Sequence, residues 1–320
     1  MIAAIAKPAV FALLSQPWRL RRRLDQLAAR GATTILNLHR VAPEDGSGYR
    51  PLAPGLFDDL LGFLSRRFHF ATIASLDEPA PRDRPRVILS FDDGYRDFFT
   101  HAMPILARHG VRVNHNLMPA AIEQGEAPLN VVAQDFLGRA PAELLALLEV
   151  PGFDRPITRT AAGALSRFIK YKPHAERQAL ATQLWPQFRR WAEFVPTPVM
   201  TLDEARRAAE RHEIGAHSFH HDSMASESDD HLRADVRACR AWFAQHMALD
   251  TDIYAFPNGS CRPEQIAIAR EEGMRHVLLV GERFAAESEA YRFTFDARSR
   301  AEMRFKATGR RAAVPIGARV

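Results

Sequence analysis

The apolar positions of this chain follow two periods. Short continuous apolar runs, typical of strands buried on both faces, alternate with segments in which apolar residues recur at i, i+3, i+4 and i+7, as in amphipathic helices. Such alternation predicts βα units and a parallel sheet, and hence the α/β class. We expect strands at 33–38, 70–73, 87–91, 111–117, 213–216, 253–256 and 277–280, and helices at 57–64, 97–109, 202–211 and 228–247.

One segment interrupts this alternation. Residues 125–195 have a largely helical pattern, and we interpret them as an insertion on the carboxyl side of the sheet rather than as a separate domain. The organisation expected is therefore a helical lead-in at 1–30, one domain at 31–307 and a weakly packed, arginine-rich tail at 308–320.

The composition is that of a globular protein with a sizeable core, because 47% of the 320 residues are apolar and 25% are charged. The formal charge of +5 reflects an arginine excess that is partly clustered at Arg19, Arg21, Arg22 and Arg23. A basic balance suits anionic glycans, lipid headgroups or nucleic acid. The sequence has no zinc-finger spacing, no aromatic RNA-binding signature and no lysine run, so we do not expect nucleic-acid binding.

The cysteines and the N-terminus indicate the compartment. Cys239 and Cys261 form no paired motif, which favours a reducing environment. The apolar segment 1–14 contains Lys7 and Pro8, lacks the pattern of a signal peptide and is too short to span a bilayer. We expect a cytoplasmic protein whose N-terminus is either a docking helix or a peripheral contact with the inner face of a membrane.

Two carboxylates follow the predicted strand 87–91. Asp92 and Asp93 are costly to place near a core unless they serve a cation or a reaction. Gly94 then allows a sharp turn. Asp-Asp-Gly is also ordinary turn chemistry, so this motif alone leaves both interpretations open.

Polar residues also follow two other predicted strands. His217 and His221 come after strand 213–216, and two histidines with one carboxylate form the ligand set of an open catalytic metal site. Barrel enzymes place their chemistry at such strand ends. Pro257, Asn258 and Gly259 end strand 253–256, where a main-chain N–H could face developing negative charge, although a plain turn is the alternative.

These segments resemble the polysaccharide deacetylases of carbohydrate esterase family 4, which share the NodB homology domain. Residues 90–94 resemble the family's Thr/Ser-Phe-Asp-Asp-Gly motif, and residues 213–221 resemble its Glu-Ile-Gly-x-His-Ser/Thr-x-x-His motif. Residues 255–259 are similar to one form of its third motif, Ala-Tyr-Pro-x-Gly, and residues 38–41 to the Tyr-His-Arg/Ser-Val start of many members. The resemblance covers about 33–295 and is weakest across the expected insertion.

This resemblance implies a distorted (β/α) barrel and metal-dependent removal of an N-acyl group, acetyl or formyl, from an amino sugar in a polysaccharide or in its lipid- or nucleotide-linked precursor. It implies that Asp93, His217 and His221 hold a divalent ion, with Zn²⁺ as the expected metal. Asp92 would be the general base toward water. An N–H near Asn258 would help to stabilise the oxyanion.

Two positions depart from the family pattern. Residues 255–256 are Ala-Phe where many members carry an arginine that orients the base. A late Leu-x-His motif, whose histidine protonates the leaving amine, has only His276 as a counterpart, at the start of its strand. The candidate general acid is instead His39, at the end of the first strand, with structural packing as the alternative. Asn116, on strand 111–117, is expected to offer a polar group to the sugar.

Two other functions compete with a hydrolase. A catalytically silent carbohydrate-binding protein would explain the missing arginine and late histidine, but not the complete set of Asp92, Asp93, His217 and His221. A non-haem iron oxygenase would use two histidines and a carboxylate without needing Asp92, and it commonly has a jelly-roll order of strands. We therefore predict a hydrolase that acts on a linear amide bond. The particular sugar and the oligomeric state stay open.

Overall fold

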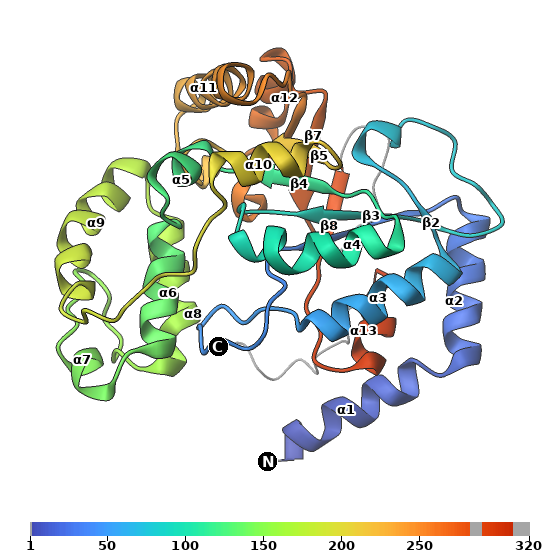
Figure 1. The fold of residues 1–320 in the computed structure, drawn as a ribbon, viewed down its shortest axis with the longest axis horizontal. Helices are drawn as coiled ribbons and strands as arrows, with labels where there is room; N and C mark the ends of the chain where they lie inside the picture. The colour runs from blue at the N-terminus through green and yellow to red at the C-terminus, as the bar shows by residue number, and fades with distance from the viewer. Residues whose placement is uncertain (1, 282–289, 310–320) are drawn as a thin grey trace.

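Parallel strands close into a barrel in the computed structural model, which describes residues 2–281 and 290–309 (Figure 1). Within these residues the sheet order is β1-β8-β7-β6-β5-β4-β3, and β1 also pairs with β3, so seven strands form a closed ring. A short eighth strand, β2, pairs with the first part of β3. This architecture confirms the predicted (β/α) barrel. The strands are β1 (Thr33–Leu38), β2 (His69–Phe70), β3 (Arg86–Phe91), β4 (Asn114–Leu117), β5 (Glu213–Ala216), β6 (Ile253–Ala255), β7 (His276–Val280) and β8 (Ala290–Thr294).

β4 begins at Asn114 rather than at 111, and two other strands differ more from the prediction. The strand expected at 70–73 ends at Phe70, because the Glu213 carboxylate accepts hydrogen bonds from the N–H groups of Ile73 and Ala74 and holds a 3₁₀ turn there. β8 was not predicted, since its apolar run is broken by Arg292. Both differences come from polar groups that are satisfied only by distant parts of the chain.

The interior of the barrel has an apolar layer and a polar layer. Ile35, Ile88, Ile253 and Leu278 form the apolar layer. Alternate residues of a strand share one face, so Asn37 and Ser90, two positions further on, lie above it. The polar layer is therefore carried toward the carboxyl ends of the strands, where the predicted site residues lie.

Helices cover the outside of the barrel (Figure 1). Proline begins α3 and α12, a Thr201 capping box begins α10, and Gly110 at φ 64° ends α4. The helix expected at 97–109 is divided into a π-helical turn at Phe98–Ala102 and α4. The covering helices are α3 (Pro54–Arg67), α4 (Met103–His109), α5 (Pro119–Gln124), α10 (Leu202–Ala209), α11 (Asp229–Met247), α12 (Pro263–Glu271) and α13 (Arg300–Lys306).

The segment expected as an insertion forms a helical group with its own hydrophobic cluster, which includes Phe136, Leu165, Leu184 and Phe188. Figure 1 shows this group at one side of the barrel. Its helices are α6 (Leu129–Arg139), α7 (Ala142–Ala146), α8 (Ala162–Lys170) and α9 (His174–Phe188).

Two helices precede the barrel, α1 (Ile2–Leu14) and α2 (Pro17–Ala29). α2 buries Leu20, Leu24 and Leu27, which lie on one face at helical spacing. None of the described helices combines the length and apolar character required to cross a membrane. Most of the expected tail, 310–320, lies outside the described residues.

Candidate active site

Asp92 is held rigidly at the carboxyl end of β3. Its Oδ1 accepts a 2.8 Å hydrogen bond from Asn116 Nδ2 and a 2.6 Å bond from an Arg292 guanidinium nitrogen. The other oxygen, Oδ2, lies 3.8 Å from His217 Nε2 and 4.0 Å from His39 Nε2. One carboxylate oxygen is therefore fixed by the barrel, and the other faces the histidines.

The charge of Asp92 is stabilised despite its burial. Desolvation alone would raise the pKa of this carboxyl, but the positive charge of Arg292 and the neighbouring imidazoles outweigh it and hold the pKa far below its usual range. Asp92 is thus ionised at neutral pH, as a general base must be.

Arg292 is the functional residue that the sequence did not reveal. It comes from β8, and its side chain has no exposed surface. The same guanidinium nitrogen lies 3.0 Å from Ser90 Oγ and 3.3 Å from Asn37 Oδ1. Arg292 therefore orients the candidate base, the role for which the third motif offers no arginine. A charged residue within a short apolar strand was its one local signal.

Asn116 also acts on the base. It is fully buried, and its amide nitrogen bonds to Asp92 while its oxygen accepts a 3.1 Å bond from Asn114. This placement does not support the predicted sugar contact, because the amide has no exposed surface. It also explains Gly215 on β5, where a Cβ atom would lie 2.3 Å from Asn116 Oδ1.

The predicted metal ligands come together. Asp93 Oδ1 lies 3.4 Å from Nε2 of His217 and 3.4 Å from Nε2 of His221. This buried oxygen has no hydrogen-bond partner among the described residues. Ligands about 2.0–2.2 Å from a tetrahedral ion are separated by roughly 3.3–3.5 Å, so the three atoms fit a divalent metal.

The protein orients these ligands. His217 Nδ1 donates a 2.7 Å hydrogen bond to the Ala255 carbonyl, which leaves Nε2 as the ring nitrogen that faces Asp93. Burial alone would raise the pKa of the Asp93 carboxyl. The surrounding imidazoles lower this pKa by more than burial raises it, so the group stays ionised. The pKa of His221 falls to about 3 through burial, so its imidazole is neutral, as a ligand requires.

Backbone strain is concentrated at this site. Of the five non-glycine residues with positive φ in the described chain, four lie here: Asp93 (73°), Ser218 (59°), His221 (58°) and Asn258 (59°). Such conformations cost about 1–3 kcal/mol each and persist where the surrounding structure enforces them. The turns after β3, β5 and β6 are therefore shaped for the site.

The third motif lies beside the histidine loop. Asn258 donates a 3.1 Å side-chain hydrogen bond to Ser223 Oγ, and Gly259 packs so tightly that a Cβ would lie 2.9 Å from Val280. Pro257 is buried. In the described part of the chain no hydrogen bond uses the Asn258 N–H, which is the group predicted to face the oxyanion.

His39 reaches the site from the end of β1. It lies edge-on to Tyr49, with ring centroids 5.6 Å apart, and its side chain is partly exposed, unlike that of Asp92. Burial lowers its pKa below 6.5. His276, by contrast, is at the first residue of β7, at the opposite end of its strand from the site.

Asp222 and His231 form a second carboxylate–histidine group, which differs from the predicted metal ligands in its contacts. Asp222 Oδ2 lies 2.8 Å from His231 Nε2, which is a hydrogen-bond distance, and Arg177 forms an ion pair with the same carboxylate. Arg177 also donates to the His221 carbonyl at 3.1 Å. We interpret this group as the attachment of α9 to the histidine loop rather than as a metal site, because a cation already occupies it.

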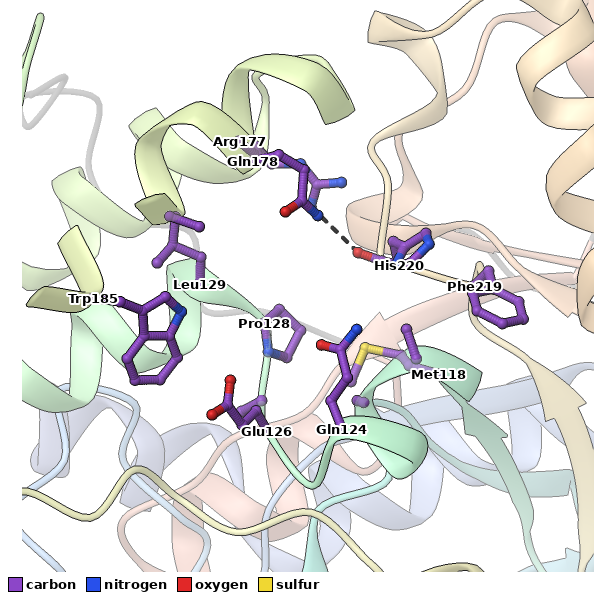
Figure 2. Close-up of a pocket in the computed structure, with 14 residues that line it drawn as sticks. Met118, Gln124, Glu126, Pro128, Leu129, Arg177, Gln178, Trp185, Phe219 and His220 are labelled. Carbon is purple, nitrogen blue, oxygen red and sulfur yellow. Dashed lines mark hydrogen bonds between the residues drawn. The ribbon is translucent and has the colours of Figure 1, made fainter. Parts of the chain in front are cut away.

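A pocket separates α9 from α5 next to this attachment (Figure 2). Its wall includes His220, the neighbour of His221. Trp185 supplies an aromatic surface, and Gln124 and Gln178 supply amides that make no side-chain hydrogen bond with the described residues. An aromatic face with free amides suits a sugar ring.

The barrel and this constellation are those that the resemblance to the deacetylases predicts. Residues 181–277 match the family model described as polysaccharide deacetylase. That region contains His217, His221 and the third motif. The predicted resemblance to the polysaccharide deacetylases, and with it the enzyme class, is confirmed. Members of this family generally use a divalent metal. No curated protein sequence matches the chain.

Solved structures share the fold. IcaB from Ammonifex degensii is 15% identical with a TM-score of 0.56, over 87% of this chain and 97% of that chain. The deacetylase PplD from Streptococcus pyogenes, in complex with acetate, is 14% identical with a TM-score of 0.55, over 82% and 92%. A de-N-acetylase from Aggregatibacter actinomycetemcomitans is 13% identical with a TM-score of 0.52, over 82% and 95%.

Proposed function

We propose that this protein is a divalent-metal-dependent hydrolase that removes an N-acyl group from an amino sugar. The observation that carries the proposal is the buried, unpartnered Asp93 oxygen at 3.4 Å from two imidazole nitrogens, beside a separate, ionised Asp92. A silent binding protein would need neither the metal cradle nor a base held by a buried arginine.

The residues divide the reaction between them. A divalent ion, expected to be Zn²⁺, would be held by Asp93, His217 and His221 and would supply Lewis acidity for the amide carbonyl and the attacking water. Asp92 Oδ2 would accept the proton of that water. The Asn258 N–H would stabilise negative charge on the carbonyl oxygen. His39 would protonate the leaving amine.

The substrate is inferred to be an N-acetylated glycan, or its lipid- or nucleotide-linked precursor. Acetate bound to the S. pyogenes relative favours acetyl over formyl as the acyl group. The pocket beside His220 has the polar and aromatic lining for a sugar unit next to the reacting one. Cys239 and Cys261 form no paired motif in the sequence, which supports a reducing, cytoplasmic location that cell fractionation would test.

The decisive experiment measures acetate release from a panel of N-acetylated amino sugars and oligosaccharides. The protein is first stripped with a chelator and then reloaded with Zn²⁺ or another divalent ion. We expect release only after reloading, and about 10²–10⁴-fold slower release from the matched variant Asp92→Asn. Protein that binds no divalent metal would refute the proposal. Metal and glycan binding without release would favour the silent binding protein.

A further inference from the structure

The N-terminal helices carry an exposed apolar ridge. Val10, Leu13 and Trp18 are 43%, 55% and 60% exposed. The remaining large apolar side chains with comparable exposure in the described chain are scattered over the insertion: Leu147, Tyr171 and Val195. Half of this exposed apolar set thus falls within residues 10–18, which indicates an interaction surface.

Packing against the domain does not explain the ridge. Phe11 attaches α1 to α13 through Phe305, with ring centroids 5.7 Å apart. Successive helical positions are about 100° apart, so Leu13 lies about 200° around α1 from Phe11. α1 therefore packs on the domain through the face that carries Phe11, and Leu13 lies on the opposite side of the helix. Figure 1 shows α1 at the margin of the molecule.

A cationic pocket adjoins the ridge. Arg21 and Arg22 are exposed, and the Arg19 guanidinium lies 4.8 Å from the centroid of the Trp18 ring. Among the described residues no ion pair neutralises Arg19, Arg21 or Arg22. The lining of the pocket includes Arg19, Arg22, Trp18, Leu14 and Phe305. It combines guanidinium groups with an apolar wall, and this combination is complementary to an anionic amphiphile.

We propose that α1 and α2 form a peripheral docking surface for a membrane that contains anionic phospholipids. The arginine-lined pocket takes a headgroup phosphate, and Val10, Leu13 and Trp18 enter the interfacial region. Each arginine near such a surface strengthens the attraction. With 13 residues, α1 is about 20 Å long, shorter than the hydrocarbon core, so it lies along the bilayer.

Other occupants fit the surface less well. A nucleic-acid backbone would match the arginines but would leave the ridge without a partner. A second copy of the chain would bring two unneutralised arginine clusters together across a twofold axis, which like-charge repulsion opposes. Of these three occupants, the anionic lipid surface alone matches both the charge and the apolar ridge.

Sedimentation with lipid vesicles tests the proposal with the full-length protein and needs no substrate. We expect binding to phosphatidylcholine vesicles that contain phosphatidylglycerol, and little binding to phosphatidylcholine alone. Arg19→Glu with Arg22→Glu should lower the partition coefficient about tenfold or more, and so should 0.5 M salt. Leu13→Ser with Trp18→Ser should also lower it, including at low salt. The melting temperature of each variant shows whether folding is retained.

The matched control is Arg155→Glu with Arg190→Glu, which changes the same charge at two exposed arginines of the insertion. This control should bind like the wild type. An equal loss in the control, or equal binding to neutral vesicles, would overturn the proposal. A lack of vesicle binding would also overturn it. If the protein then forms a dimer that Leu13→Ser with Trp18→Ser dissociates, the surface binds a second copy; if it binds an oligonucleotide in a salt-sensitive manner, the surface binds nucleic acid.

Discussion

Arg292 and Asp92 form a buried ion pair across the barrel interior, with a guanidinium nitrogen 2.6 Å from Oδ1. The two residues are 200 positions apart in the chain. The pair joins β8 to the end of β3, so the element that completes the barrel also orients the base. Closure of the fold and assembly of the site are therefore coupled.

Replacing Arg292 with methionine should therefore affect both. Loss of the cation raises the pKa of Asp92, so the acid limb of the kcat/KM pH profile should move to higher pH, and kcat should fall about 10²-fold or more. An uncompensated buried carboxylate should also cost about 3–5 kcal/mol of unfolding free energy. Arg292→Lys, which keeps the charge, should shift the profile less. Reduced stability with an unmoved profile would show a structural role alone.

The sequence predicted the site wherever its residues follow a locally readable strand. Asp92, Asp93, His217 and His221 come directly after apolar runs, and parallel strands bring their carboxyl ends to one rim. Local turn chemistry then sets the side chains, as the positive φ of Asp93 and His221 shows. The strand pattern placed these residues at one rim, and the resemblance to the deacetylases assigned their expected roles.

Arg292 could not be found in this way, because its partners lie on β1, β7 and β3 and directly after β3. Its strand is short, and its polar residue interrupts the pattern from which a strand is recognised. For the same reason Asn116 was assigned to the sugar. Only barrel closure shows that its amide reaches Asp92. Contacts across the barrel depend on tertiary structure, which the local spacing of apolar residues does not predict.

A metal-binding assay should distinguish the roles of the two adjacent aspartates. Asp92→Asn should retain the metal and lose about 10²–10⁴-fold in kcat, because it removes the proton acceptor and leaves Asp93, His217 and His221 in place. His217→Ala should lose the metal itself. Elemental analysis after gel filtration, combined with acetate release, distinguishes the two effects. Equal metal loss in both variants would contradict the separate roles.

His39 should affect the basic side of the pH profile. Burial lowers its pKa below 6.5, so the protonated form required of a general acid is lost as the pH rises through that value. His39→Gln should lower kcat about 10²-fold and remove this basic limb. A packing role would instead lower the melting temperature and leave the limb unchanged.

Gly215 should be required for activity although it touches no substrate. In Gly215→Ala the new Cβ would meet Asn116 Oδ1 at 2.3 Å and Ile253 Cγ2 at 2.8 Å. Asn116 must then move and release Asp92, so kcat should fall. Gly163→Ala is the matched control, since nothing lies within 4 Å of its Cβ. In helix α8 the control should be neutral, or stabilising by about 0.5–1 kcal/mol. Similar activity in both variants would contradict the proposed role of Asn116.

His115 should make the fold sensitive to acid. It is fully buried beside Phe98, with ring centroids 4.0 Å apart, and neither ring nitrogen has a hydrogen-bond partner among the described residues. Burial lowers its pKa to about 3. Between pH 6.5 and 3 the unfolded chain therefore binds a proton that the native state does not. The free energy of unfolding decreases by up to about 1.4 kcal/mol for each unit by which the pH is lowered. His115→Leu should remove this share and gain about 1 kcal/mol at pH 7. Urea unfolding at pH 7 and pH 5 measures both, and an unchanged pH difference in the variant would show that His115 does not carry the effect.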